Sequence, residues 1–170
     1  SGEPPNRHDI PYAPGDRLWV REAWQALYEF DHLKPSDISA GSDVLYNADR
    51  PDTPWDSRKR PSIFMPRWAS RLTLTVTNVR VQRVREIGEE DAMAEGMFYE
   101  RGGGQNRIVE GWYNGVKGRS FARSHPSQSF RDLWNSLNAK RGFGWDANPW
   151  VVAITFKTHR CNIDQMGKTL

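Results

Sequence analysis

Residues 58–96 read RKRPSIFMPRWASRLTLTVTNVRVQRVREIGEEDAMAEG, and this stretch changes character twice. Apolar and polar side chains first alternate over residues 71–76, which is typical of a half-buried strand. The apolar face carries Leu72, Leu74 and Val76, and the polar face carries Thr73, Thr75 and Thr77. Residues 89–95 are then helix formers that end at Gly96, which predicts a short helix with a glycine stop. A long strand therefore leads into a short helix.

The same stretch separates its charges. Residues 58–85 contain eight Arg and Lys side chains and no Asp or Glu, whereas residues 86–100 contain six carboxylates and no Lys or Arg. A basic face of this kind fits a phosphate backbone, and carboxylates beside it can contact a base or exchange protons. The alternative is a solvated strand face followed by acids that suit the positive end of a helix dipole.

Length and charge fit one domain with an uneven surface. The 170 residues suffice for one core, and the net charge is +3. Residues 1–57 carry 5 basic and 11 acidic groups, while residues 101–170 carry 11 basic and 4 acidic groups. This asymmetry fits a nucleic-acid partner, although proteins that bind nothing charged show it too.

The sequence predicts no cofactor, no metal and no membrane contact. Cys161 is the single cysteine, and the four histidines lack the spacing of metal ligands. Since no apolar run is long enough to span a bilayer and no secretory leader is recognised, we expect a cytoplasmic protein. The oligomeric state stays open.

One domain with two insertions is the expected organisation. Residues 1–14 contain four prolines and predict an extended entry segment. The domain itself is expected over residues 15–158. Residues 31–43 are expected to form a polar loop outside the core, and residues 100–125 a flexible, basic, glycine-rich insertion. Residues 159–170 are expected to form a polar tail.

Three further strands are predicted, two of them from alternation. Residues 17–24 alternate after a Gly-Asp turn, residues 44–48 form a short strand candidate, and residues 150–157 form a closing strand. These short strands place the chain in the mostly β, α+β class.

A second helix is predicted from about Ser129 to Lys140. Ser129 and Asp132 have the spacing of a capping box, which indicates a helix start at Ser129. Apolar residues at helical spacing then predict one face packed into the core. That face consists of Phe130, Leu133, Trp134 and Leu137.

Glu22 falls on the apolar face of the first predicted strand. Because an unpaired buried charge is costly, this carboxylate must be paired or lie at a cavity. We predict an ion pair with an arginine at the wall of a cleft. The alternative is an acid that contacts the ligand in a binding pocket.

Trp55 and Trp68 flank the basic cluster formed by Arg58, Lys59 and Arg60. Cations interleaved with indoles suit a site that holds phosphates while a ring stacks on a base. A loop held in place by a buried indole has the same composition.

Four motifs, in their order along the chain, carry a family resemblance. They are GDRLWVRE at 15–22, LTLTVTNVRVQRVREIGEEDAMAEG at 72–96, FRDLWNSL at 130–137 and NPWVVAITFK at 148–157. In this order they resemble the ASCH-domain family, in particular the tryptophan-rich ASCH proteins of phages and prophages. The resemblance implies a small, partly open β-barrel related to the PUA domain, with short flanking helices and a cleft for RNA or a nucleobase. Several short strands with two short helices suit such a barrel better than a doubly wound sheet.

The resemblance also implies a candidate catalytic residue. One branch of the family removes the acetyl group from N4-acetylcytidine with a lysine, a threonine and a glutamate, and the glutamate's segment corresponds here to Glu95. Residues 1–14 contain no match to the family's lysine and threonine motif. Either an N-terminal strand is missing from this chain, or the chain lacks that half of the site.

Three functions follow as hypotheses. The first is a module that binds RNA or a nucleoside, with DNA as a further ligand class. The second is an amidohydrolase of N4-acetylcytidine-type nucleosides with Glu95 as general acid or base. The third is a phage structural or host-interaction protein. The expected binding residues are Trp19, Arg21, Glu22, Arg58, Lys59, Arg60, Arg67, Trp68 and Arg71.

Overall fold

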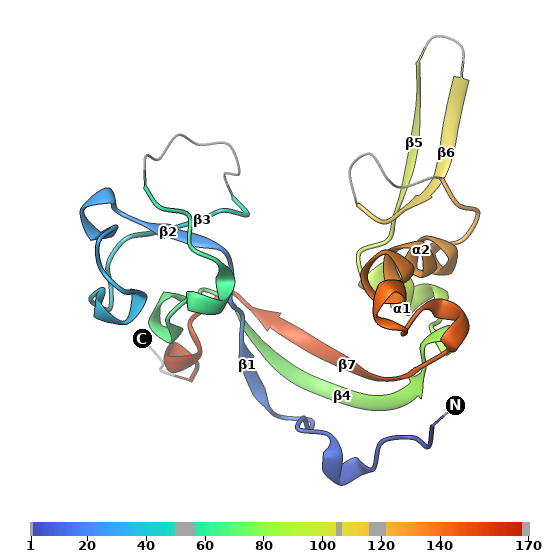
Figure 1. Cartoon of the computed structure of the whole chain (residues 1–170), viewed down its shortest axis with the longest axis horizontal. Helices are drawn as coiled ribbons and strands as arrows, with labels where there is room; N and C mark the ends of the chain where they lie inside the picture. The colour runs from blue at the N-terminus through green and yellow to red at the C-terminus, as the bar shows by residue number, and fades with distance from the viewer. Residues whose placement is uncertain (1, 50–56, 105–106, 116–121, 168–170) are drawn as a thin grey trace. The chain divides into compact units, whose positions relative to one another are not determined.

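The structure is a computed structural model that describes residues 2–49, 57–104, 107–115 and 122–167. Contacts between residues divide the chain into two compact units (Figure 1). Unit 1 comprises Ser1–Ile10 and Arg80–Ala153, and unit 2 comprises Pro11–Val79 and Ile154–Leu170. Two long strands, β4 (Thr73–Arg83) and β7 (Trp150–His159), contribute residues to both units.

Within the described ranges the chain is α+β and mostly β, as expected, with its seven strands in three separate sheets. The first sheet has the order β1-β4-β7, with β1 (Arg17–Trp19) antiparallel to β4. The antiparallel pairs β2 (Trp24–Ala26) with β3 (Val44–Tyr46), and β5 (Phe98–Gly104) with β6 (Arg107–Tyr113), form the other two. The described strands do not close into a barrel, so a PUA-like barrel stays a prediction.

The strand predicted over residues 17–24 is in fact two strands, so that prediction is wrong. β1 ends at Trp19, and Trp24 begins a different sheet. The chain changes sheets here because Trp24 exchanges two backbone hydrogen bonds with Arg60, at 3.0 and 2.8 Å. Glu22 lies in the connecting segment, where alternation no longer determines which way a side chain points.

β4 confirms the central strand but corrects the exposure of its polar face. Thr73 was expected on a solvated face and is fully buried. Its hydroxyl donates to the carbonyl oxygen of Cys161 at 2.9 Å, and Thr75 Oγ1 lies 3.1 Å from Nε2 of His159. The C-terminal residues therefore cover this part of the strand, and the threonine hydroxyl is satisfied by hydrogen bonding.

The core of unit 2 includes a residue that was expected to lie outside it. Ile38 is 2% exposed and packs with Trp24, Ala26, Met65 and Ala69. It follows a 3-10 helix, η3 (Pro35–Asp37), inside the predicted polar loop 31–43. The sequence did not indicate this burial because the residues around Ile38 are polar. Burial of the Ile38 side chain stabilises the fold by about 1.5–3 kcal/mol.

The C-terminal residues are held against unit 2. The Nδ2 atom of Asn162 lies 2.9, 3.2 and 2.8 Å from the carbonyl oxygens of Arg67, Trp68 and Ser70. Its Oδ1 accepts from the backbone N–H of Asp164 at the start of η9 (Ile163–Gln165). The polar segment expected as a tail thus packs against the chain up to η9.

The two helices of unit 1 occur where the sequence predicts them, with one corrected start. α1 (Glu89–Ala94) ends at Glu95, and Gly96 follows with a φ of 93°, which a glycine adopts without strain. α2 (Pro126–Asn138) begins three residues before Ser129 because a proline occupies its first turn. The Ser129 hydroxyl is not a cap: it is buried and donates to the carbonyl oxygen of Trp112 at 2.7 Å.

The apolar face predicted for α2 is only partly correct. Phe130 and Trp134 are half-buried, with ring centroids 6.1 Å apart. Leu137 is 64% exposed, so its placement in the core is wrong. It lies in the last turn of the helix.

The predicted flexible insertion 100–125 contains most of a β-hairpin. β5 pairs with β6, with Phe98 opposite Tyr113 and Tyr99 opposite Trp112. The first pair of rings is stacked at 6.0 Å and the second meets edge to face at 5.6 Å. Aromatic cross-strand pairs of this kind stabilise a hairpin despite a glycine-rich end. Residues 116–121 of the insertion lie outside the described residues.

Candidate nucleic-acid interface

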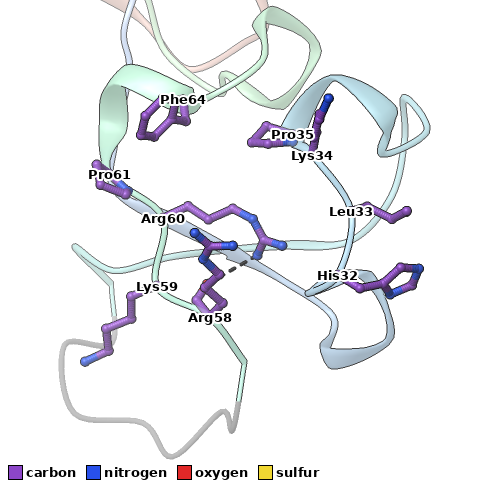
Figure 2. A pocket seen from close by; sticks show the side chains of 9 residues that line it. All are labelled: His32, Leu33, Lys34, Pro35, Arg58, Lys59, Arg60, Pro61 and Phe64. Atoms are coloured by element: carbon purple, nitrogen blue, oxygen red, sulfur yellow. Dashed lines mark hydrogen bonds between the residues drawn. The ribbon is translucent and has the colours of Figure 1, made fainter.

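A cavity of about 280 Å³ lies within unit 2, between residues 32–35 and residues 58–64 (Figure 2). Both segments precede or follow strands of the β2-β3 sheet, so the cavity is built on loops anchored to a short sheet. The lining residues are His32, Leu33, Lys34, Pro35, Arg58, Lys59, Arg60, Pro61 and Phe64. Three of them, Arg58, Lys59 and Arg60, are binding residues expected from the sequence.

Arg60 holds the two lining segments together. Its side chain is 4% exposed and donates to Asp31 Oδ1 at 3.2 Å and to the carbonyl oxygen of Phe30 at 2.9 Å. The other Asp31 oxygen accepts from the backbone N–H of Arg58 at 2.8 Å. The Arg60 guanidinium also lies 5.3 Å from the ring centroid of Trp24. A buried arginine with this many partners is fixed in place, so it shapes the cavity rather than moving to a ligand.

The remaining cations of the cavity face solvent. Lys34, Arg58 and Lys59 are exposed, and none of these side chains forms an ion pair with a carboxylate in the described part of the chain. Figure 2 shows the Lys59 side chain extending outward, away from the other lining side chains. Three exposed positive charges around one cavity make a positive potential that attracts an anion.

Apolar side chains complete the cavity. In Figure 2, Phe64 and Pro61 lie on one side and Leu33 and Pro35 on the other, with the Arg60 side chain crossing between them. Phe64 is 57% exposed, although it is a large apolar residue. The cavity therefore combines cations with apolar surface, as sites for charged ligands that carry a ring do.

Most arginines further along the predicted basic stretch are neutralised. Carboxylates from other parts of the chain pair with them: Arg67 with Asp164, Arg71 with Glu22 and Asp49, Arg80 with Asp91, and Arg85 with Asp146. The stretch is also shared between the two units. Of the two interpretations of residues 58–85, these ion pairs favour the solvated strand face outside the cavity.

Arg71 is the centre of an internal ion-pair cluster. It donates two hydrogen bonds to Glu22, at 2.9 and 2.8 Å, and pairs with Asp49, while its guanidinium lies 3.9 Å from the ring centroid of Tyr46. The bonds to Glu22 and then Asp49 raise the pKa of Arg71, and burial is the main cause that raises the pKa of Tyr46. The ion pair predicted for Glu22 is confirmed. Glu22 does not line the cavity.

The other expected binding residues are engaged within unit 2. Trp19 and Trp68 pack partly buried against the core, which favours the buried-indole interpretation for Trp68. The Arg21 guanidinium stacks on the Trp19 ring at 4.6 Å and donates to the carbonyl oxygen of Ile63 at 3.3 Å. Trp55 lies outside the described residues.

Glu95 is exposed at the C-cap of α1 in unit 1 and does not line the cavity of unit 2. Its catalytic role stays a prediction. No three His, Cys, Asp or Glu side chains among the described residues gather in a group that could hold a metal ion. No helix formed by the described residues has the length and apolar character needed to cross a membrane.

Sequence reasoning missed Phe64 and the segment Leu33–Pro35 as parts of the site. A signal for Phe64 was present: three cations, a proline and a serine are followed by an Ile-Phe pair. Nothing in the sequence indicates that residues 32–35 lie across from it, because Asp31 and Arg60 bring the two segments together over 29 residues.

Comparisons with known proteins return nothing: no protein-family model, no curated protein and no solved structure matches the chain. The resemblance to ASCH proteins therefore stays a prediction.

Proposed function

We propose that this chain binds RNA, with the phosphate groups held at the cavity of unit 2 by Lys34, Arg58 and Lys59. The observation that carries the proposal is the contrast within one basic cluster. Arg60 is buried and paired, whereas its two neighbours and Lys34 are exposed cations around a cavity. The resemblance to ASCH proteins implies the same class of ligand.

The arrangement suits a phosphate backbone for two physical reasons. Each phosphate that is neutralised releases condensed counterions, which favours binding at low salt. The ion pair of Arg60 with Asp31 fixes the backbone of Arg58 and Lys59 before the ligand arrives, so less entropy is lost on binding. Since these exposed cations have no carboxylate partner among the described residues, binding there also avoids the cost of breaking an ion pair.

The experiment is a titration of a fluorescent single-stranded RNA with the double variant R58E/K59E. We expect this variant to bind at least about tenfold more weakly than the parent at about 50 mM salt, because two attractive charges become repulsive. Arg60 is left intact, since removing it would leave Asp31 unpaired and disturb the cavity itself.

The matched control is K140E/R141E, which makes the same change in net charge at two exposed residues of unit 1. It should bind RNA within about twofold of the parent if the cavity is the site. Equal weakening by both double variants would contradict the proposal, because binding would then follow net charge alone.

A further inference from the structure

An exposed apolar turn lies directly beside the cations of the cavity. The 3-10 helix η4 (Ser62–Phe64) leaves Ile63 66% and Phe64 57% exposed, while the next residue, Met65, is 3% exposed in the core. Arg21 donates a hydrogen bond to the Ile63 carbonyl oxygen, and the backbone N–H of Met65 donates to Ser62. The turn is thus anchored at both its core side and its carbonyl, and the Phe64 ring is presented outward on a fixed backbone.

Phe64 lines the same cavity as the exposed cations Lys34 and Arg58. Figure 2 shows its ring on one side of the cavity, with Pro35 and Leu33 opposite and the Arg60 side chain between them. The cavity therefore offers a planar group the aromatic ring of Phe64 on one side and the aliphatic side chains of Leu33 and Pro35 on the other. The volume of about 280 Å³ is at the lower end of small-molecule sites.

We infer that the cavity receives one unpaired nucleotide of an RNA strand, with its base against Phe64 and its flanking phosphates at Lys34, Arg58 and Lys59. This inference rests on the proposed function and adds the class of substrate to it. A base within a duplex has both faces covered by its neighbours in the stack, so it cannot lie against Phe64 without leaving the helix. The outward Lys59 then reaches the next phosphate along the strand.

The inference predicts how affinity depends on the bases. Stacking of a base on an aromatic side chain changes affinity by about tenfold when that side chain is replaced with alanine. The phosphate contacts contribute to every polyanion, whereas the Phe64 contact contributes only where an unpaired base is present. The affinity of the parent for a strand without bases should therefore equal the affinity of the Phe64→Ala variant for a strand that has bases.

The test uses the full chain and three labelled probes of equal length: single-stranded oligouridylate, an RNA duplex and an abasic ribose-phosphate strand. For the parent we expect oligouridylate to bind about tenfold more tightly than the abasic strand and more tightly than the duplex. Phe64→Ala should lose about tenfold in affinity for oligouridylate while its affinity for the abasic strand changes less than about twofold.

Matched variants keep the test independent of folding. Tyr28→Ala removes a ring that is 74% exposed in the same unit and does not line the cavity, so it should bind all three probes like the parent. Phe64→Trp keeps an aromatic face and should retain the preference for oligouridylate. Since Phe64 is exposed, Phe64→Ala should unfold at the temperature of the parent.

The outcomes separate the inference from the function on which it rests. If Phe64→Ala binds oligouridylate like the parent while R58E/K59E is weakened, the inference is overturned and the proposed function stands. If uridine monophosphate competes as well as the strand does, the ligand is a free nucleotide and the strand-binding inference is overturned. If neither variant alters binding of any probe, both the inference and the proposed function are wrong.

Discussion

Arg58 and Arg60 are two residues apart in one basic cluster, and the structure gives them opposite roles. Arg60 is 4% exposed and bonded to Asp31, whereas Arg58 is exposed and offers Asp31 only its backbone N–H. The sequence of the cluster does not show which of the two arginines is buried. The difference arises from Trp24, whose backbone pairs with Arg60 and turns its side chain inward.

The ion pair of Glu22 with Arg71 gives a first stability prediction. The Glu22 side chain is 13% exposed, and Glu22→Gln removes the carboxylate that pairs with Arg71 there. We expect this variant to lower the free energy of unfolding by about 1.5–3 kcal/mol. The control is Asp146→Asn, whose carboxylate is 96% exposed and which should change the free energy of unfolding by less than about 1 kcal/mol. Urea unfolding curves measure both. Equal effects of the two variants would contradict the role assigned to Glu22.

The pKa of Tyr46, raised above 10 by burial, gives a prediction about pH. Unfolded chains lose this phenolic proton near pH 10, whereas folded Tyr46 keeps it to higher pH. The folded state then binds more protons than the unfolded state, so the stability linked to Tyr46 is full below pH 10 and falls as pH rises through the folded pKa.

Tyr46→Phe should therefore differ from the parent in a pH-dependent way. At about pH 8 it loses the hydrogen bond from Tyr46 to the carbonyl oxygen of Ala69 and about 0.5–1.5 kcal/mol of stability. The difference in stability between the variant and the parent should become smaller by about pH 11, because only the parent has a Tyr46 hydroxyl whose deprotonation destabilises the folded state. Melting temperatures across this range measure this difference, with the exposed Tyr28→Phe as control. A difference that stays constant with pH would refute the linkage.

The ion pair of Glu22 was predictable from its apolar neighbours, since a half-buried carboxylate needs a cation. Its partner was not predictable, because Arg71 lies 49 residues away and competes with many other arginines. The same holds for the cavity. Its cations are evident in the sequence, whereas the opposite side, Leu33 to Pro35, is brought into place by tertiary contacts such as that of Asp31 with Arg60.

At the scale of elements, alternation was informative where strands are long or regular. It predicts β4 and β7, helix formers that end at a glycine predict α1, and helical spacing predicts α2. It failed at residues 17–24, where one run of alternation serves two sheets, and at β5 and β6, where glycines suggested a loop. In the hairpin the aromatic pairs of Phe98 with Tyr113 and Tyr99 with Trp112 override the low strand propensity of glycine.

Gly111 gives the prediction for this hairpin. A Cβ atom at this position would lie 2.8 Å from the Ala122 Cβ and 2.9 Å from the Arg123 carbonyl oxygen. Because Arg123 exchanges two backbone hydrogen bonds with Trp112, Gly111→Ala must push this bridge apart, at a cost of about 1–3 kcal/mol. Thermal unfolding should show a melting temperature lower by about 3 °C or more. Gly2→Ala, where a Cβ meets nothing within 4 Å, should unfold like the parent, and a similar result for Gly111→Ala would contradict this packing.

At the scale of the whole molecule, the acidic and basic segments of the sequence do not form separate acidic and basic surfaces. The acidic excess of residues 1–57 is used in part to pair with the arginines of the central stretch, through Asp31, Glu22 and Asp49. The net charge of +3 is therefore a poor guide to where an anion binds. Lys34, Arg58 and Lys59 stand out because they are exposed cations that gather around one cavity.

The most direct test of this account is the salt dependence of RNA binding by the parent and by R58Q/K59Q. If three cations each neutralise one phosphate, a plot of log affinity against log salt concentration should have a slope of about −2 for the parent. The variant, with two of the three cations neutral, should have a slope of about −0.7. A steep slope that is the same for both proteins, or a parent affinity that does not change with salt, would contradict the assignment of this cavity as the nucleic-acid site.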